Sequence, residues 1–290
     1  MTEARSREER TMTPEELAHA LADSGRASIP YADPFNPDRP LVLECYRPAA
    51  HAPHKPVVIV QHGQSRNGRD YCDAWIPVAD LTGFLVIAIT FPKSAWPDAL
   101  QYNNGYVRAE DGAVRPRETW SLAIPGHVFG LLRASGLTAR PKTFLWGHSA
   151  GGQFVHRLLA TQPHDIFEAV GAANSGWYTL PTLDRDYPEG LGGIGQAQDD
   201  LARLLAYPLV IFSGDRDIDT EAENLPRHAA ALAQGPHRFA RSQSFLDYGQ
   251  AAAARLGLPC NWRRVVVPGV GHEGMRMSDF AARTWFNSPA

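Results

Sequence analysis

The sequence predicts an α/β fold, with a mostly parallel central sheet covered by helices on both faces. Apolar runs of strand length alternate with segments of helical period from residue 57 to 285. The runs are apolar at nearly every position, as in residues 84–90, which suits strands buried on both faces. Polar residues follow directly after several runs, at the sheet edge where open α/β sheets carry their sites. These three observations together indicate one α/β domain over residues 41–290.

The first 40 residues are predicted to form an arm and a short helix ahead of that domain. Thr13 can cap the helix, Pro14 suits its first turn, and Glu16 stands where it completes a capping box. The helix is expected to end near residue 24. Residues 30–40 contain four prolines, so we expect an extended connector there.

Strands and helices are assigned from the period of the apolar residues. The predicted strands are residues 41–47, 57–61, 84–90, 143–147, 167–173, 207–212 and 264–267. The predicted helices are residues 70–82, 117–135 with an interruption at Pro125, 150–161, 195–206, 226–234, 236–256 and 275–286. Two stretches, 92–116 and 175–206, interrupt this alternation. Long excursions in a compact domain are often functional, and we expect cap-like or lid-like segments there.

A G-x-S-x-G motif formed by Gly147, Ser149 and Gly151 is the most informative feature of the chain. It follows a predicted strand and precedes a predicted helix, which is the context of a nucleophile elbow. Such a serine has strained backbone angles, so its neighbours must be small. The same letters could also describe a glycine-rich turn with a capping serine. The motif therefore needs support from the rest of the chain.

Candidate partners for the serine lie after the later strands. A serine hydroxyl needs an adjacent base to become a good nucleophile, and His272 stands after the last strand, just before the closing helix. An acid should orient that histidine. Asp215, Asp217 and Asp219 alternate after the strand at 207–212, so their position alone leaves all three open. His148, although adjacent to the serine, is interpreted as a packing and hydrogen-bonding residue.

With these motifs in this order, the chain resembles the α/β-hydrolase superfamily over roughly residues 40–285. The order serine, aspartate, histidine is that of its catalytic triad. Within the superfamily the chain resembles the polyhydroxybutyrate-depolymerase and feruloyl-esterase-like branch. The motifs that carry this narrower likeness are Gln-His-Gly-Gln-Ser at 61–65, Gly-His-Ser-Ala-Gly-Gly at 147–152, Leu-Pro-Arg at 225–227 and Gln-Gly-Pro-His-Arg at 234–238.

The resemblance implies an α/β-hydrolase fold and a role for each site residue. Ser149 would be the nucleophile and His272 the base, and the spacing from Gly214 would select Asp217 as the acid. The backbone N–H groups of Gln64 and Ala150 would form the oxyanion hole, with Ser65 as an alternative to Gln64, and His62 would brace the oxyanion loop. Aromatic residues of the two excursions are candidates for contact with the substrate: Trp177, Tyr178, Trp96 and Tyr102.

The expected activity is hydrolysis of carboxylic esters, including aryl or polyester-type substrates, through an acyl-enzyme intermediate. An amidase or peptidase and an acyltransferase use the same triad and remain alternatives. A non-catalytic binding protein is the fourth reading, although such proteins typically lack a triad member and this chain has a candidate for each. The expected partner is a small-molecule or oligomeric ester.

Composition excludes several other classes. The net charge is −3 and the basic residues are scattered, which does not suit nucleic acid or an anionic membrane. No apolar run is long enough for a membrane span, and the polar N-terminus lacks the apolar core of a signal peptide. The three cysteines match no zinc spacing and suit a reducing compartment, so we expect a cytoplasmic protein.

No cofactor or metal is expected. The alternating aspartates at 215–219 lack the spacing and final glutamate of a calcium-binding EF-hand loop. A glycine cluster at 190–195 follows no strand and carries no Lys-Ser or Lys-Thr pair, so it is not a phosphate-binding loop.

Overall fold

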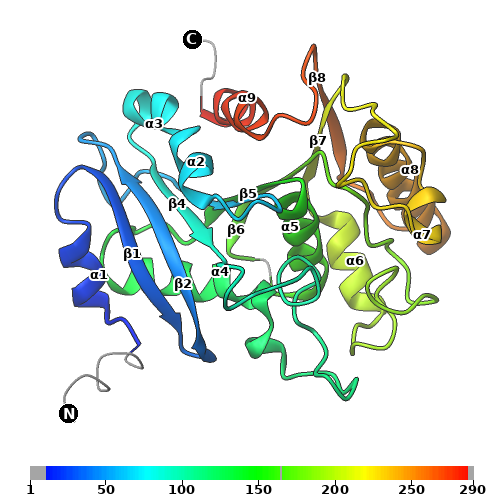
Figure 1. Cartoon of the computed structure of the whole chain (residues 1–290), viewed down its shortest axis with the longest axis horizontal. Helices are drawn as coiled ribbons and strands as arrows, with labels where there is room; N and C mark the ends of the chain where they lie inside the picture. Colours follow the sequence, from blue (N-terminus) through cyan, green and yellow to red (C-terminus); the bar gives the residue numbers. More distant parts are fainter. Residues whose placement is uncertain (1–10, 164, 287–290) are drawn as a thin grey trace.

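The computed structural model describes residues 11–163 and 165–286, so the first ten residues of the predicted arm lie outside the described part. Its centre is one eight-stranded sheet with the order β1-β2-β4-β3-β5-β6-β7-β8 (Figure 1). The strands are β1 Gly25–Asp33, β2 Asn36–Arg47, β3 Val57–Gln61, β4 Leu85–Thr90, β5 Thr143–His148, β6 Phe167–Ala173, β7 Leu209–Gly214 and β8 Arg263–Val267. Strand β2 pairs antiparallel with β1 and β4, and every other pairing is parallel. The predicted α/β class with a mostly parallel sheet is confirmed.

Helices cover both faces of the sheet. The helices are α1 Pro14–Ala20, α2 Gly68–Asp73, α3 Ile76–Thr82, α4 Ile124–Ala134, α5 Ala150–Thr161, α6 Gln198–Ala206, α7 Ala229–Leu232, α8 Arg238–Leu256 and α9 Gly274–Phe286. In Figure 1, α2, α3 and α9 lie above the sheet, whereas α1, α4, α5 and α6 lie below it. Ile59 belongs to the core on the α5 face, and its neighbours Val58 and Val60 to the core under α9. This alternation explains why residues 57–60 of β3 are apolar at every position.

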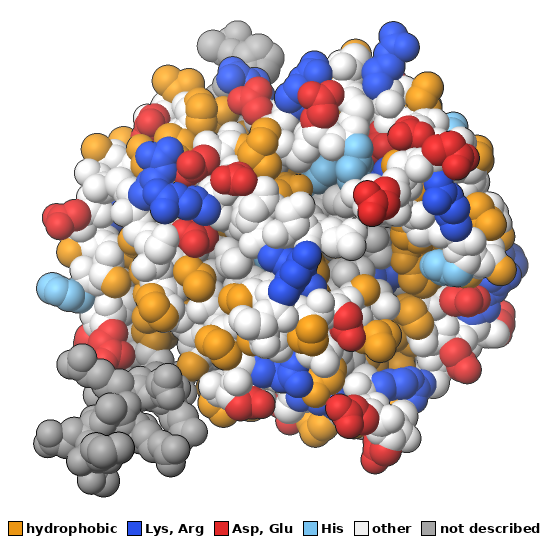
Figure 2. Space-filling view, viewed as in Figure 1, with side chains coloured by type: hydrophobic (Ala, Val, Ile, Leu, Met, Phe, Trp, Pro, Cys, Tyr) orange, Lys and Arg blue, Asp and Glu red, His pale blue; other side chains and the backbone are white. Residues whose placement is uncertain are grey.

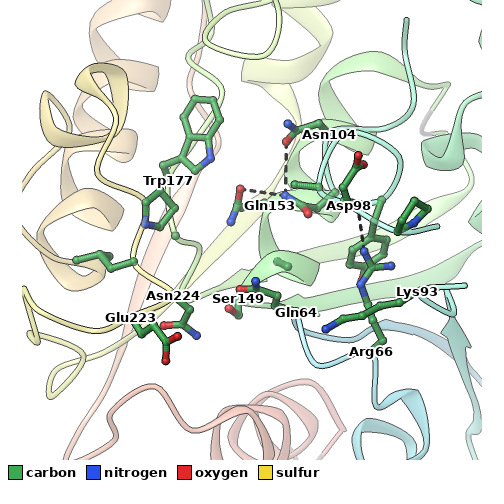
Figure 3. Close-up of a pocket in the computed structure, with 18 of the residues that line it drawn as sticks. Gln64, Arg66, Lys93, Asp98, Asn104, Ser149, Gln153, Trp177, Glu223 and Asn224 are labelled. Atoms are coloured by element: carbon green, nitrogen blue, oxygen red, sulfur yellow. Dashed lines mark hydrogen bonds between the residues drawn. The ribbon is translucent and has the colours of Figure 1, made fainter. Parts of the chain in front are cut away.

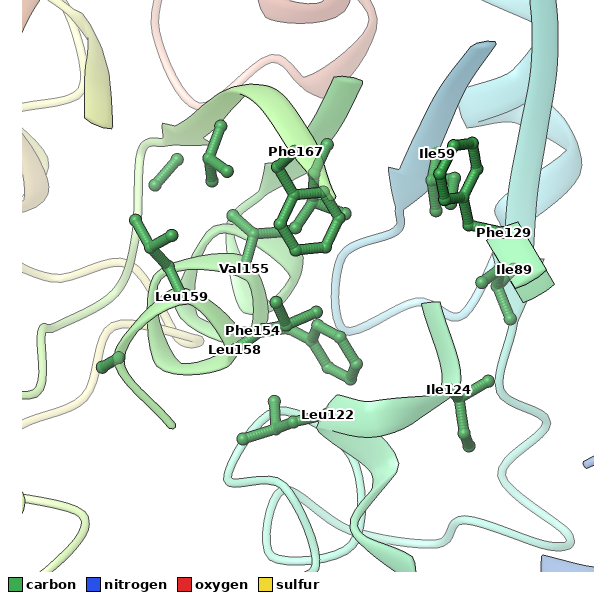
Figure 4. Packing of buried hydrophobic residues seen from close by; sticks show 14 of the residues in the cluster. Ile59, Ile89, Leu122, Ile124, Phe129, Phe154, Val155, Leu158, Leu159 and Phe167 are labelled. Atoms are coloured by element: carbon green, nitrogen blue, oxygen red, sulfur yellow. The ribbon is translucent and has the colours of Figure 1, made fainter. Parts of the chain in front are cut away.

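The larger core surrounds α5 and fixes the helix that follows the candidate nucleophile. Phe154 and Leu158 of α5 pack with Leu122, Ile124 and Phe129 from the segment that leads into α4 and from α4 itself (Figure 4). All twelve residues of α5 are buried. The start of this helix is therefore held in place by packing on every side.

The prediction of an extended connector at residues 30–40 is wrong. These residues belong to the hairpin of β1 and β2, so the sheet begins at Gly25. Prolines are compatible with this hairpin because Pro30 lies on the edge strand β1. Pro37 and Pro40 lie in the part of β2 that precedes its pairing with β4, which starts at Val42.

Two predicted helices are divided in the structure, and proline explains both cases. The predicted helix at 70–82 is α2 followed by α3, with Pro77 in the first turn of α3. The predicted helix at 117–135 consists of two 3₁₀ turns, Arg117–Thr119 and Ser121–Ala123, followed by α4, and Pro125 lies in the first turn of α4. Proline lacks the N–H that a helix interior requires, so in each case it begins a helix.

Candidate active site

Ser149 lies at a sharp turn between β5 and α5. Its backbone angles are φ 58° and ψ −117°, outside the regions that residues with a side chain prefer. A Cβ on Gly147 would lie 2.1 Å from the carbonyl oxygen of Gly151, and a Cβ on Gly151 would lie 2.2 Å from that of Gln61. The turn can therefore form only with glycine on both sides of the serine.

Ser149, His272 and Asp217 form a continuous chain of hydrogen bonds. His272 lies between β8 and α9, and its Nε2 is 2.9 Å from the Ser149 Oγ. Its Nδ1 is 2.8 Å from Oδ2 of Asp217, three residues beyond the end of β7. A carboxylate can only accept, so Nδ1 carries the proton and Nε2 is left to accept from the serine hydroxyl. This is the arrangement a general base requires.

The other two aspartates of the β7 loop have different partners. Asp215 Oδ1 accepts the backbone N–H of Gly269 at 2.7 Å, and Asp219 Oδ1 accepts that of Glu221 at 2.8 Å. Both side chains therefore stabilise loops. Among the three, Asp217 is the one placed beside His272.

Arg238, at the start of α8, contacts the second oxygen of the Asp217 carboxylate. The sequence analysis assigned no role to this arginine. Its Nη1 lies 3.5 Å from Asp217 Oδ1, and its Nη2 donates to Oδ1 of Asn224 at 2.7 Å. Burial lowers the pKa of Arg238, whereas Asp217 opposes that shift. Arg238 belongs to the motif Gln-Gly-Pro-His-Arg. The contact could not be predicted from that motif, because Arg238 is 21 residues from Asp217 in the sequence.

His148 packs against His272. The two rings lie 4.7 Å apart, and the His148 Nδ1 is 2.8 Å from the Tyr71 hydroxyl. Burial, with the charges of His272 and Arg238 nearby, holds the pKa of His148 well below its usual range. Its ring therefore stays neutral and supports His272 by packing.

His62 holds the loop that carries Gln64. Its Nε2 accepts the backbone N–H of Phe91 at 3.0 Å, so its Nδ1 donates to the carbonyl oxygen of Gly63 at 2.9 Å. Burial lowers the pKa of His62 to about 3, so this ring is neutral as well. Gln64 and Ala150 line the same cavity as Ser149. Within residues 11–163 and 165–286, neither of their backbone N–H groups donates a hydrogen bond.

A cavity of about 540 Å³ opens over Ser149. Of the four aromatic residues predicted to contact a substrate, Trp177 and Tyr102 line it, although the Tyr102 ring is fully buried beneath Arg66. The prediction is wrong for the other two. Trp96 is fully buried against Phe91, with ring centres 5.2 Å apart, and Tyr178 stacks on Phe245 in the core. In each case the ring fills space beneath the excursion and does not reach the cavity.

Polar side chains that the sequence reading missed complete the cavity wall. Figure 3 shows Arg66, Lys93 and Asp98 on one side of Ser149 and Trp177 on the other, with Gln153 between them. The Arg66 guanidinium lies 4.2 Å from the ring centre of Tyr102. One signal was available in the sequence, because Gln153 stands four residues after Ser149 on the same helix face.

Charged side chains of both signs are scattered over the face in Figure 2. In the described residues, no three histidine, cysteine, aspartate or glutamate side chains lie where they could hold a metal ion together. None of the helices that the structure describes is long and apolar enough to span a membrane.

Neither a protein-family profile nor a curated protein sequence matches this chain. Solved structures do. The poly(3-hydroxybutyrate) depolymerase LpqC from Bordetella parapertussis is 48% identical, with 96% of each chain covered and a TM-score of 0.92. Poly(aspartic acid) hydrolase-1 from Sphingomonas sp. KT-1 is 34% identical over 90% of this chain and 98% of its own, with a TM-score of 0.85. An S-formylglutathione hydrolase from Agrobacterium tumefaciens, at 14% identity and a TM-score of 0.57, shares the fold, with 90% of this chain and 92% of its own covered.

Proposed function

This chain belongs to the poly(3-hydroxybutyrate)-depolymerase-like branch of the α/β-hydrolase superfamily, and from that premise we propose that Ser149, His272 and Asp217 are the triad with which it cleaves carboxylic esters. The observation that carries the proposal is the hydrogen-bonded chain from Ser149 Oγ through His272 to Asp217, with the serine on a strained elbow. Strain of this kind persists only where the surrounding structure enforces it.

The proposed reaction assigns one group to each step. His272 Nε2 takes the proton of Ser149 as Oγ attacks the ester carbonyl, and Asp217 stabilises the imidazolium that forms. The N–H groups of Gln64 and Ala150 hold the negative oxygen of the tetrahedral intermediate. His272 returns the proton to the leaving alkoxide, and an acyl-serine remains. Water, deprotonated by the same histidine, then releases the acid and restores the serine.

The proposed substrates are esters of hydroxy acids in short chains. The LpqC depolymerase, 48% identical, is named for a polyester of this kind. A cavity of about 540 Å³ has room for more than one monomer unit beside Ser149, and Trp177 offers apolar surface to the carbon chain.

A chain bearing carboxylates is a second candidate, favoured by one observation. Arg66 and Lys93 line the cavity, and no carboxylate side chain in the described residues forms an ion pair with either. The 34% identical hydrolase is named for poly(aspartic acid), a polyamide with such carboxylates. A parallel assay of 3-hydroxybutyrate oligomers and of poly(aspartic acid) separates the two candidates.

Replacing the nucleophile tests the proposal directly. Ser149→Ala should lower ester turnover on the order of 10⁶-fold, because a triad serine has no substitute. A fluorophosphonate should label the wild type at Ser149 and leave the variant unlabelled. Turnover above roughly a hundredth of the wild-type rate, with the fold intact by circular dichroism, would overturn the assignment.

A reducing compartment, such as the cytoplasm, is part of the proposal. Cys45, Cys72 and Cys260 are free thiols, and burial raises the pKa of each. Such thiols are typical of proteins that fold without disulfides. Fractionation of the native cells, followed by detection of the protein, tests the location.

A further inference from the structure

Arg157 is a buried cation beneath the cavity. It lies on α5, and its side chain is fully buried. Burial lowers the pKa of Arg157 to about 10, so it remains charged at neutral pH. No carboxylate pairs with it among the residues that the structure describes. Buried charges normally require such a partner. The groups that contact Arg157 in place of a carboxylate are therefore held by a strong donor.

Two of the three nitrogens of this guanidinium donate to neutral oxygens. Nη1 donates to the carbonyl oxygen of Asn103 at 2.8 Å, to Asn104 Oδ1 at 2.7 Å and to Gln153 Oε1 at 3.2 Å. Nε donates to Thr179 Oγ1 at 2.9 Å. The guanidinium also lies 4.7 Å from the ring centre of Trp177. Three of its neighbours, Asn103, Asn104 and Gln153, line the cavity.

Arginine therefore decides which end of the Gln153 carboxamide faces the cavity. Because a guanidinium has only donors, the Gln153 atom beside it must be the oxygen. The same oxygen accepts Nδ2 of Asn103 at 3.2 Å. The nitrogen, Nε2, donates to no group in the described part of the chain. In the view of Figure 3 this nitrogen is directed toward the part of the cavity that contains Ser149.

The position of Gln153 relative to the triad indicates which part of the substrate it meets. The leaving alcohol must lie beside His272, which returns its proton. His272 lies two residues before α9, and in the view of Figure 3 α9 and Gln153 lie on opposite sides of Ser149. Gln153 consequently faces the acyl chain of the substrate. Because its Nε2 can only donate, it favours an acyl chain that carries a hydrogen-bond acceptor.

We propose that Gln153 Nε2 is a carbonyl-binding subsite, oriented by Arg157, that recognises a second carbonyl group in the acyl part of the substrate. The inference rests on the proposed ester hydrolysis and narrows its substrate class to chains with a carbonyl in the neighbouring unit. In a chain of 3-hydroxy acids, four bonds separate the scissile carbonyl carbon from the next carbonyl carbon on the acyl side.

A matched pair of chromogenic esters tests the subsite. p-Nitrophenyl 5-oxohexanoate and p-nitrophenyl hexanoate have equal chain lengths and differ by one ketone, which stands four bonds from the scissile carbonyl carbon. We expect the wild type to have a kcat/KM about fivefold or more higher for the oxo ester, as one additional neutral hydrogen bond provides. Equal values for the two esters would overturn the subsite, whereas absence of hydrolysis of both would contradict the proposed ester hydrolysis itself.

Variants of Gln153 locate the effect. In Gln153→Met the ratio of the two kcat/KM values should fall to about 1, because methionine fills the volume without an amide donor. In Gln153→Glu, whose carboxylate can pair with Arg157, the ratio should fall to 1 or below. Gln250→Met, on the exposed side of α8, is the matched control and should keep the wild-type ratio. Fluorophosphonate labelling shows that each variant is folded at the elbow, and a wild-type ratio in both Gln153 variants would reject the assignment.

Discussion

Asp217 Oδ1 lies 3.5 Å from Arg238 Nη1, while its other oxygen, Oδ2, meets His272 at 2.8 Å. The carboxylate is thus held from two sides and cannot rotate away from the imidazole. Both side chains are almost wholly buried, at 1% exposure for Arg238 and 2% for Asp217. Arg238 also holds Asn224 of the cavity wall. One buried cation thus connects Asp217, the proposed acid, to the cavity wall.

Removing that cation should damage both catalysis and stability. In Arg238→Met we expect kcat to fall about tenfold or more, because Asp217 loses the contact that fixes its orientation. The free energy of unfolding should fall by about 3 kcal/mol, since a buried carboxylate loses its partner. Arg238→Lys, which keeps the charge, should recover part of both losses. Urea unfolding and ester kinetics measure them, and an unchanged kcat in a folded Arg238→Met would contradict the positioning role.

Substitution of the three loop aspartates should single out Asp217. Asp217→Asn removes the carboxylate that keeps the proton on His272 Nδ1, and turnover should fall on the order of 10⁴-fold. Asp215→Asn and Asp219→Asn serve as controls. Their partners are the N–H groups of Gly269 and Glu221, which an amide oxygen can still accept. If Asp219→Asn proved the most damaging of the three, Asp217 would not be the acid.

Stability should decrease in acid because of His62. The pKa of this ring is about 3 in the folded protein, owing to burial, and near 6.5 in an unfolded chain. Between these values the unfolded chain binds more protons, so stability rises with pH there and is lost as pH falls below 6.5. The loss from this one group is about 1.4 kcal/mol for each pH unit.

A variant isolates the contribution of His62. His62→Gln can still accept the N–H of Phe91 but cannot titrate, so the slope of unfolding free energy between pH 4 and 6 should decrease by about 1.4 kcal/mol per pH unit. His54→Gln, on the surface, is the control. A wild-type slope in His62→Gln would show that acid destabilisation has another source.

Trp177 should determine which acyl or alcohol groups are accepted. Its ring lines the cavity, whereas Trp96 lies in the core. We expect Trp177→Ala to change the ratio of kcat/KM for bulky and acetyl esters by about tenfold or more, or roughly 1.4 kcal/mol. Trp96→Ala should lower the melting temperature and leave that ratio unchanged. Equal behaviour of the two variants would place Trp177 with the structural residues.

Most of the parallel part of the sheet could be predicted from sequence, because each of its strands contains a run of apolar residues. The β1–β2 hairpin could not. Four prolines at 30–40 argue against a strand unless the strand lies at the edge of a sheet. Only the tertiary structure shows that β1, in which Pro30 pairs with Val42, is an edge strand. Trp96 and Tyr178 illustrate the same limit, because an aromatic residue on an excursion can pack inward or face a cavity with the same local sequence.

By itself the sequence determined one requirement of the sharp turn at Ser149, because Gly147 makes room for the carbonyl oxygen of Gly151, four residues away, whereas Gly151 makes room for that of Gln61 at the end of β3. It also determined the capped start of α1 at Thr13, where every contact is local. Tertiary structure alone decided that Asp217, of three alternating aspartates, meets a histidine 55 residues away, and that Arg157 turns the donor of Gln153 toward the cavity. Backbone geometry and capping depend on neighbours along the chain, whereas the orientation of a carboxylate or an amide depends on whatever the fold packs against it.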